Sequence, residues 1–255
     1  MTARGYVELD RELEQYLRLL LQGMGRTERL QALGLYATGL LLSGERKSIA
    51  PMAARLSASA AEADAMRQRL QQAVVVAKWE PRVLFARLAH HLNQELGDIE
   101  ALIGDDTGIP RYGDHCVGTA RQYSGTLGRV DRCQVIPSLH AAGPRGSFCV
   151  GARLYLPDKW TESPERMREA GVPDGVTFAT KWELMLGLID QATQNDEGNP
   201  HLGWDSLPFV GDAGYGDVSE LRRELNVRGR PYILEVMLTT SVWPPGTEPE
   251  SREGL

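Results

Sequence analysis

The sequence has few cysteines, no excess of positive charge and no long apolar run. Its 255 residues include three cysteines, Cys116, Cys133 and Cys149, which lie far apart and form no C-x-x-C pair. An odd number of scattered cysteines argues against a disulfide framework and favours reduced thiols in the cytoplasm. The first ten residues lack a signal peptide's apolar core, and the longest apolar stretch, residues 30–42, is too short and mixed to span a bilayer. We therefore expect a cytoplasmic protein that does not enter a membrane.

Positive charge is also scarce. The chain has 28 Lys and Arg against 34 Asp and Glu, which gives a formal net charge of −6. Residues 1–100 carry 13 of the basic and 12 of the acidic residues, and the rest of the chain carries 15 and 22. Because DNA phosphates attract clustered Lys and Arg, DNA binding would have to use local basic patches or metal ions rather than the net charge.

The motifs of several enzyme classes are absent from the sequence. It has no G-x-S-x-G segment and no G-x-x-x-x-G-K-[ST] segment, which disfavours a serine hydrolase and an NTPase. The five histidines are isolated or, like His90 and His91, adjacent on a predicted helix where they face different directions. Without ligand spacing among Cys and His, a zinc site is also disfavoured.

What is present is an ordinary globular composition, 42% hydrophobic and 24% charged. Residues 8–95 read as helical, because leucines such as Leu13, Leu17 and Leu20 recur at helical spacing. Pro51 and Pro81 suit the first turns of helices. After residue 97 strands and helices alternate, which predicts an α/β sheet, and residues 243–255 are rich in Pro and charge and predict a flexible tail.

Aspartates after two apolar segments carry the strongest chemical signal. Asp105 and Asp106 end a predicted strand, and Asp212 follows a second short strand, residues 207–210, before a glycine-rich turn. Adjacent residues of an extended chain point to opposite faces, so only one of Asp105 and Asp106 can enter a shared site. A turn at Asp105 and Asp106 and a helix N-cap at Asp212 are the structural alternatives. If the strand ends converge, a divalent cation such as Mg²⁺ would relieve the repulsion between the carboxylates.

A polar stretch at residues 121–129 combines basic, aromatic and hydroxyl side chains with flexible glycines. It reads Arg121-Gln122-Tyr123-Ser124-Gly125-Thr126-Leu127-Gly128-Arg129. Such a loop can follow a nucleic-acid backbone. A β-hairpin with glycine in its turn explains the same residues without any ligand.

Ordered motifs along most of the chain resemble one known family. The two that carry the aspartates are Asp105-Asp106-Thr107-Gly108-Ile109-Pro110 and Asp212-Ala213-Gly214-Tyr215-Gly216. The others are residues 44–48, 51–56, 113, 115, 117–118, 120–128, 133–135, 138–140, 153–157, 171–173 and 180–184. Together they span nearly all of residues 30–243 and are similar to the DDE superfamily endonucleases of insertion sequences, the DDE-type transposases.

The resemblance implies an architecture. It predicts an α/β fold with an RNase H-like mixed sheet core, incomplete at its C-terminal end, preceded by an α-helical N-terminal domain. The expected divisions are a helical domain over residues 1–96, a catalytic-core region over residues 97–242 and the flexible tail over residues 243–255.

The resemblance also implies a chemistry. The family holds Mg²⁺ or Mn²⁺ with an Asp, Asp, Glu triad and uses it to cleave and join DNA strands. Asp106 matches the family's first Asp best, with Asp105 as the alternative, and Asp212 matches the second. Thr107 and His115 are expected to support the site from nearby.

DNA is the partner that the resemblance implies, and family members usually act as multimers, so a homo-oligomer is expected. Seven polar side chains in or next to the matching motifs are candidates for DNA contact. They are Arg46, Lys47, Arg121, Gln122, Tyr123, Arg129 and Lys181.

The family's third carboxylate has no match in this sequence. The family's Glu lies on a helix well beyond the second Asp, whereas the sequence ends at Leu255, 43 residues after Asp212 (255 − 212). Glu183 and Glu220 do not stand at the family's position. We therefore expect a fragment, a truncated transposase with impaired activity, or a repurposed descendant. The alternatives are a non-catalytic DNA-binding or regulatory protein and a scaffold recruited to a small-molecule reaction.

Overall fold

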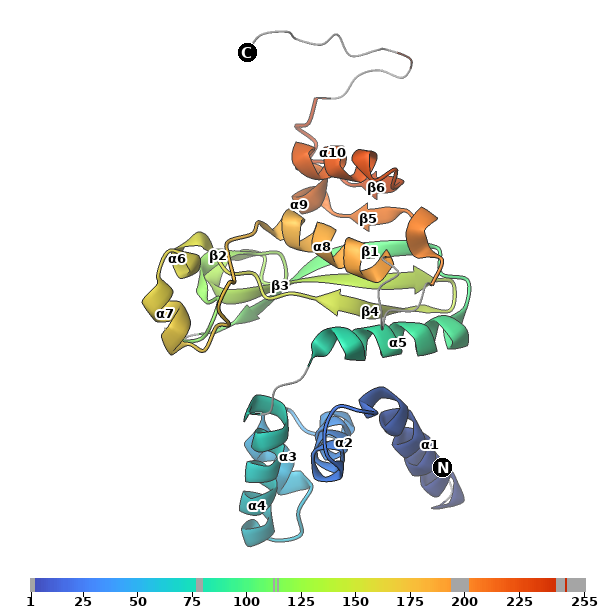
Figure 1. Ribbon diagram of the computed structural model, residues 1–255, viewed down its shortest axis with the longest axis vertical. Helices are drawn as coiled ribbons and strands as arrows, with labels where there is room; N and C mark the ends of the chain where they lie inside the picture. The colour runs from blue at the N-terminus through green and yellow to red at the C-terminus, as the bar shows by residue number, and fades with distance from the viewer. Residues whose placement is uncertain are drawn as a thin grey trace. The chain divides into compact units, whose positions relative to one another are not determined.

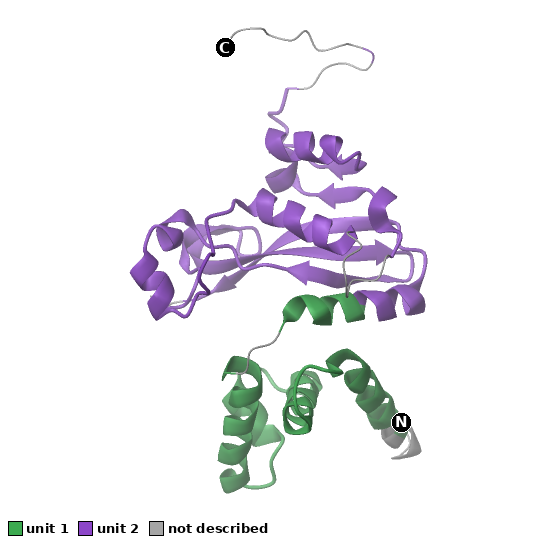
Figure 2. Cartoon of the chain, in the orientation of Figure 1, with its two compact units in different colours: residues 1–88 green, residues 89–255 purple. Residues whose placement is uncertain are grey.

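The computed structural model describes residues 3–76, 80–111, 113, 115–193, 202–241 and 246. The chain divides into two compact units, residues 1–88 and residues 89–255 (Figure 2). The predicted boundary between residues 96 and 97 stays a prediction, since helix α5 (Pro81–Leu96) contributes residues to both units. The predicted tail lies outside the described residues, apart from Gly246.

The first unit is helical, as the leucine spacing predicts. Its elements are α1 (Ala3–Leu21), α2 (Thr27–Leu41), α3 (Ile49–Arg55), α4 (Ala60–Gln71), the π-helix η1 (Gln72–Val76) and the first half of α5. Ser59 caps α4, since its hydroxyl accepts a hydrogen bond from the Glu62 amide at 3.3 Å, and the Glu62 carboxylate accepts one from the Ala58 amide at 3.0 Å. Pro81 begins α5, where its missing N–H costs no hydrogen bond.

The second unit is built on one mixed sheet of six strands (Figure 1). They are β1 (Ala101–Pro110), β2 (Ala120–Ser124), β3 (Arg129–Gly143), β4 (Gly146–Ala152), β5 (Phe209–Gly211) and β6 (Tyr232–Leu234). β1 pairs antiparallel with β3 and parallel with β5, and β5 pairs parallel with β6. β2 and β4 pair antiparallel with opposite ends of β3. The order β4-β3-β1-β5-β6, with three antiparallel strands followed by two parallel ones, confirms the predicted RNase H-like mixed sheet.

Helices cover this sheet and fill its core. They are the second half of α5, α6 (Asp158–Thr161), α7 (Pro164–Glu169), α8 (Lys181–Thr193), η2 (Trp204–Ser206), α9 (Ala213–Gly216) and α10 (Ser219–Val227). α8 packs on β3 and β4, and its Met185, Leu188 and Ile189 are each at most 2% exposed. Full burial of such side chains contributes about 1.5–3 kcal/mol each, so α8 is firmly held against the sheet.

The position of the first aspartates differs from the prediction. The sequence predicts that Asp105 and Asp106 end a strand, but β1 continues through them to Pro110. The reason is the long antiparallel ladder with β3, which pairs Asp105 with Ser138 and Asp106 with Pro137 and runs on to Cys133.

Candidate functional site

The candidate site lies where β5 ends beside β1. In the parallel ladder between these strands, Gly104 pairs with Gly211, and the chain then leaves β5 at Asp212 to begin α9. Asp105 and Asp106 continue along β1 past this point. The ladder therefore brings the two motifs that contain the candidate metal ligands to the same place in the sheet.

The pleat of β1 separates the two adjacent aspartates. Asp106 shares a face with Leu102 and Gly104, and a Cβ at Gly104 would meet Phe209 and Met185 of α8, so this is the face that α8 covers. Asp105 lies on the opposite face and is exposed. Only Asp106 thus points toward the helices of the candidate site.

The Asp105 carboxylate completes the backbone hydrogen bonding of β1. The Leu102 amide donates toward β5, to the Pro208 carbonyl at 2.9 Å. Every second amide of a strand faces the same neighbouring strand, so the Asp106 amide also points to the side of β1 where β5 lies. β5 has already ended there. The Asp106 amide instead donates to Asp105 Oδ1 at 2.7 Å. Asp105 therefore supports the site by satisfying an amide that the sheet leaves unpaired.

Both oxygens of the Asp106 carboxylate have partners from helices. Oδ1 accepts a hydrogen bond from the Tyr215 hydroxyl at 2.6 Å, and Oδ2 accepts one from Lys181 Nζ at 2.8 Å. The side chains of Asp106 and Lys181 are 23% and 36% exposed, so the ion pair is only partly solvated. These two contacts fix the orientation of Asp106 between α8 and α9.

Tyr215 joins the two aspartate motifs. It lies one turn into α9, whose N-cap is Asp212, and Asp212 Oδ1 accepts from the Gly214 amide at 3.0 Å. The Tyr215 ring is 3% exposed and packs edge-on against Phe209, with ring centroids 6.2 Å apart. The N-cap alternative for Asp212 is thus realised, and the same short helix delivers the hydroxyl that holds Asp106.

The surroundings of Tyr215 keep its hydroxyl protonated. Burial raises the pKa of this hydroxyl far above the ordinary value of 10.0, and the negative charges of Asp106, Asp212 and Asp105 raise this pKa further. Tyr215 therefore can only donate to Asp106. Its hydrogen bond links the Asp106 carboxylate to the short helix that begins at Asp212.

Lys181 stands at the first position of α8, where the helix dipole favours acids and disfavours a cation. A capping box fixes this end of the helix: the Thr180 hydroxyl accepts from the Glu183 amide at 3.4 Å, and Glu183 Oε2 accepts from the Thr180 amide at 2.7 Å. The Thr180 hydroxyl also donates to Glu183 Oε2 at 2.7 Å, and this hydrogen bond, with the one from the Thr180 amide, lowers the pKa of Glu183. Glu183 therefore has a structural role, and Lys181 is held by tertiary contacts with Asp106 and with the Tyr155 ring, 5.9 Å away.

No complete metal-binding cluster is seen in the described residues. Among them, no three side chains of His, Cys, Asp and Glu lie in an arrangement that could hold a metal ion. Thr107 is exposed on the face of β1 opposite to Asp106, and His115 is exposed in the turn that follows β1. Neither side chain therefore adds to the group around Tyr215.

The predicted DNA-contact stretch forms the β2–β3 hairpin, so the hairpin alternative describes its backbone. Arg121 and Tyr123 alternate outward along β2 and are exposed, with Tyr123 61% exposed. Gln122 is half-buried, and its Nε2 donates to the Cys133 carbonyl at 2.9 Å. Arg129 forms an ion pair with Asp131 at 2.8 Å. Arg121 and Tyr123 thus remain the side chains of this hairpin best presented to a ligand.

The hairpin turn is tied to β1. The Gly108 amide donates to Thr126 Oγ1 at 3.1 Å, and a Cβ at Gly108 would overlap Ser124 Oγ at 1.8 Å. Only glycine permits this close approach. The motif around Asp106 and the glycine-containing turn therefore form one structural piece.

The remaining candidates, Arg46 and Lys47, belong to the first unit. Both are exposed and lie in the segment between α2 and α3. Lys47 Nζ donates to the Leu42 carbonyl, and the Arg46 carbonyl accepts from Arg55 at 2.9 Å. These contacts hold the segment in place, while the Arg46 side chain projects from an exposed position.

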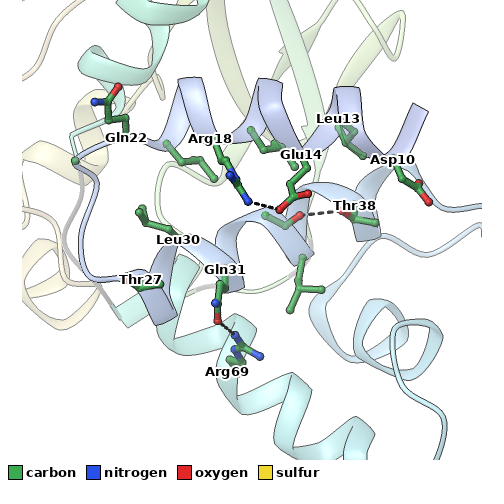
Figure 3. Close-up of a pocket in the computed structure, with 15 residues that line it drawn as sticks. Asp10, Leu13, Glu14, Arg18, Gln22, Thr27, Leu30, Gln31, Thr38 and Arg69 are labelled. Atoms are coloured by element: carbon green, nitrogen blue, oxygen red, sulfur yellow. Dashed lines mark hydrogen bonds and ion pairs between the residues drawn. The ribbon is translucent and has the colours of Figure 1, made fainter. Parts of the chain in front are cut away.

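The first unit also contains a groove of about 900 Å³ between α1 and α2 (Figure 3). Leucines from both helices line it, including Leu13, Leu17 and Leu30. Both of its arginines are paired, Arg18 with Glu14 at 2.6 Å and Arg69 with Gln31 at 3.0 Å. The groove therefore offers no acid–base or metal-binding group comparable to those around Asp106.

Tyr215 is the residue whose role the sequence reasoning missed. Tyr215 lies in the glycine-rich motif that follows Asp212. It comes three residues after Asp212, about one helical turn, and this spacing is the signal that Tyr215 lies near the Asp212 carboxylate. The structure pairs Lys181 with Asp106, and the contact of Lys181 with DNA stays a prediction. Side chains of both α8 and α9 donate hydrogen bonds to Asp106.

In the described part of the chain, no helix is long and apolar enough to cross a membrane.

Comparisons with known proteins give the family. A search of curated proteins finds no match. A family model described as DDE superfamily endonuclease matches residues 19–254, which include β1, α8, β5 and α9. Because this match takes in most of both units and every residue of the site around Tyr215, the chain belongs to the DDE superfamily endonucleases, a transposase-like family.

Proposed function

We propose that the protein acts on DNA strands by divalent-metal phosphoryl transfer, with Asp106 and Asp212 as metal ligands. The observation that carries this proposal is the hydrogen bond from Tyr215, in the motif that begins at Asp212, to Asp106, in a chain of this family. DDE superfamily endonucleases generally use divalent metals, and Mg²⁺ or Mn²⁺ prefers the carboxylate oxygens that such a site supplies. The same family membership supports DNA as the partner.

The charges at the site fit a divalent cation. Asp106 and Asp212 contribute two negative charges where β5 ends beside β1, and Lys181 contributes one positive charge at Asp106. One negative charge is left unmatched there, which favours a cation such as Mg²⁺ or Mn²⁺. Asp106 and Asp212 would hold the cation, and Asp105 would keep β1 in register behind them.

Each residue then has a defined task. When bound, the metal supplies Lewis-acid activation of the phosphoryl group and of the attacking oxygen. Tyr215 keeps its proton and orients Asp106 through the 2.6 Å hydrogen bond. Arg121 and Tyr123 offer a charge and an aromatic face to the nucleic-acid backbone and bases. Arg46, a candidate of the first unit, would add contacts to phosphates.

We propose further that strand cleavage is weak. Among the described residues no third carboxylate joins Asp106 and Asp212 in a metal-binding group, and Lys181 already occupies one oxygen of Asp106. The same two observations favour a second candidate function, a DNA-binding or regulatory protein without catalysis. Both functions use the same DNA surface, so the dependence on metal separates them.

Nicking of supercoiled plasmid in Mn²⁺ tests the proposed activity. We expect slow Mn²⁺-dependent nicking by the wild type, and a fall on the order of a hundredfold in Asp106→Asn and Asp212→Asn, because a ligand to the metal contributes several kcal/mol to the reaction. Asp10→Asn, which removes an exposed carboxylate from α1, is the matched control and should nick like the wild type.

Two other results would change the conclusion. DNA retardation in a gel without metal, with no nicking by any variant, would support the non-catalytic function. Equal nicking by the wild type and Asp106→Asn would exclude the proposed site altogether.

A further inference from the structure

We propose that Lys181 is an internal counter-ion that occupies Asp106 in the metal-free protein and leaves it for a DNA phosphate when the metal binds. This inference rests on the proposed function, since it concerns the same carboxylate. It makes Lys181 a positioning residue that links metal binding to DNA binding.

The first support is the placement of Lys181. Its Nζ lies 2.8 Å from Asp106 Oδ2, while Asp106 Oδ1 is held by Tyr215. A cation is disfavoured in the first turn of a helix, and the capping box of Thr180 and Glu183 fixes the backbone there. The ammonium group is therefore kept at this place by Asp106 and the Tyr155 ring rather than by any preference of α8.

The second support is that a metal and the ammonium compete for one carboxylate. Mg²⁺ binds carboxylate oxygens at about 2.1 Å, so on Asp106 it would lie within roughly 5 Å of Nζ if Lys181 stayed in place. A divalent and a monovalent cation repel strongly at that separation in a partly buried site. Lys181 would therefore move away, and the loss of its ion pair would weaken metal binding about tenfold, the scale of a partly exposed ion pair.

The third support is the reach of the lysine. Its stem is flexible, and its side chain is 36% exposed beside that of Asp106, which is 23% exposed, so its ammonium can turn from Asp106 to a ligand in solvent. A DNA phosphate beside the metal would offer it a new anion. DNA would then remove the competitor from Asp106, so metal and DNA should strengthen each other's binding.

The test is an Mn²⁺ titration followed by electron paramagnetic resonance, with and without a short DNA duplex. We expect Lys181→Met to bind Mn²⁺ about tenfold more tightly than the wild type without DNA, and to gain less affinity when DNA is added. Lys181→Arg keeps the charge and should resemble the wild type. Lys159→Met removes the same charge from α6 and is the matched control, expected to leave the Mn²⁺ affinity unchanged.

The contrary outcomes separate the two proposals. If the wild type and Lys181→Met bind Mn²⁺ equally, or if Lys181→Met binds it more weakly, the role of Lys181 as a competitor is wrong while the metal site stands. If neither binds Mn²⁺, with or without DNA, the metal site itself is wrong and both proposals fail. If circular dichroism shows that Lys181→Met does not fold, Lys181→Gln replaces it, because glutamine keeps a polar side chain without the charge. Lys181→Gln is then expected to bind Mn²⁺ more tightly than the wild type without DNA and to gain less affinity when DNA is added.

Discussion

Tyr215→Phe removes a single hydroxyl from the centre of the site and leaves the shape of the ring intact. That hydroxyl donates to Asp106 Oδ1 at 2.6 Å from a side chain that is only 3% exposed. A hydrogen bond to a charged group contributes about 1.5–3 kcal/mol to stability. Asp106 is 23% exposed and keeps its ion pair with Lys181, so the lower part of that range applies. We expect Tyr215→Phe to lower the free energy of unfolding by about 1.5 kcal/mol.

Urea unfolding followed by tryptophan fluorescence reports mainly on the relevant unit, because four of the five tryptophans belong to residues 89–255, namely Trp160, Trp182, Trp204 and Trp243. The midpoint should fall while the slope with denaturant stays constant, since the area exposed on unfolding is unchanged. Tyr232→Phe is the matched control: no described residue is recorded as a partner of its hydroxyl, and the loss should be within about 0.5 kcal/mol.

A double-mutant cycle with Asp106→Ala attributes the loss to this contact. In the Asp106→Ala background the hydroxyl has lost its acceptor, so Tyr215→Phe should cost almost nothing there. An equal loss in both backgrounds, or a loss below about 0.5 kcal/mol in the wild type, would refute the reasoning that Tyr215 holds Asp106.

Three further substitutions test the surroundings of the site. Glu183→Ala removes one half of a capping box and should cost about 0.5–1 kcal/mol at pH 7. Hydrogen bonds from Thr180 lower the folded pKa of Glu183 below its ordinary 4.5. This contribution to stability is therefore present above about pH 4.5 and is lost as the pH falls through the folded pKa. Urea unfolding at pH 3 should show a smaller difference in stability between the wild type and Glu183→Ala. Gly104→Ala places a Cβ 2.7 Å from the Phe209 ring and should destabilise by about 2 kcal/mol in the same assay, and a stability equal to the wild type would contradict the packing. Gly187→Ala meets no atom within 4 Å on an exposed turn of α8 and should stabilise by roughly 0.5–1 kcal/mol, with a loss of stability as the contrary result.

Much of the fold follows from local patterns in the sequence. Pro81 marks the first residue of α5, as its fixed backbone angle and missing N–H require. The predicted alternation of strands and helices after residue 97 is present in the second unit. The order of the strands depends on pairing between distant segments, which periodicity does not encode, and the resemblance to the family predicted only the RNase H-like mixed sheet.

The interior of the site was less predictable. The sequence could say that only one of Asp105 and Asp106 enters a shared site, because alternation along an extended chain is a local property. It could not say that β1 continues past both residues, since the ladder with β3 sets that length. The pairing of Lys181 with Asp106 joins residues 75 positions apart, and only the packing of α8 on the sheet creates it.

The measurement that most directly tests the account is Mn²⁺ binding by the wild type, Asp105→Ala, Asp106→Ala and Asp212→Ala under identical conditions. We predict that Asp106→Ala and Asp212→Ala each weaken binding by at least about tenfold, because each removes an oxygen ligand. Asp105→Ala should have a smaller effect, since Asp105 faces away from α8 and supports the backbone. Loss of binding in Asp105→Ala with unchanged binding in Asp106→Ala, or no binding by the wild type, would contradict the assignment of Asp106 and Asp212 as the metal ligands.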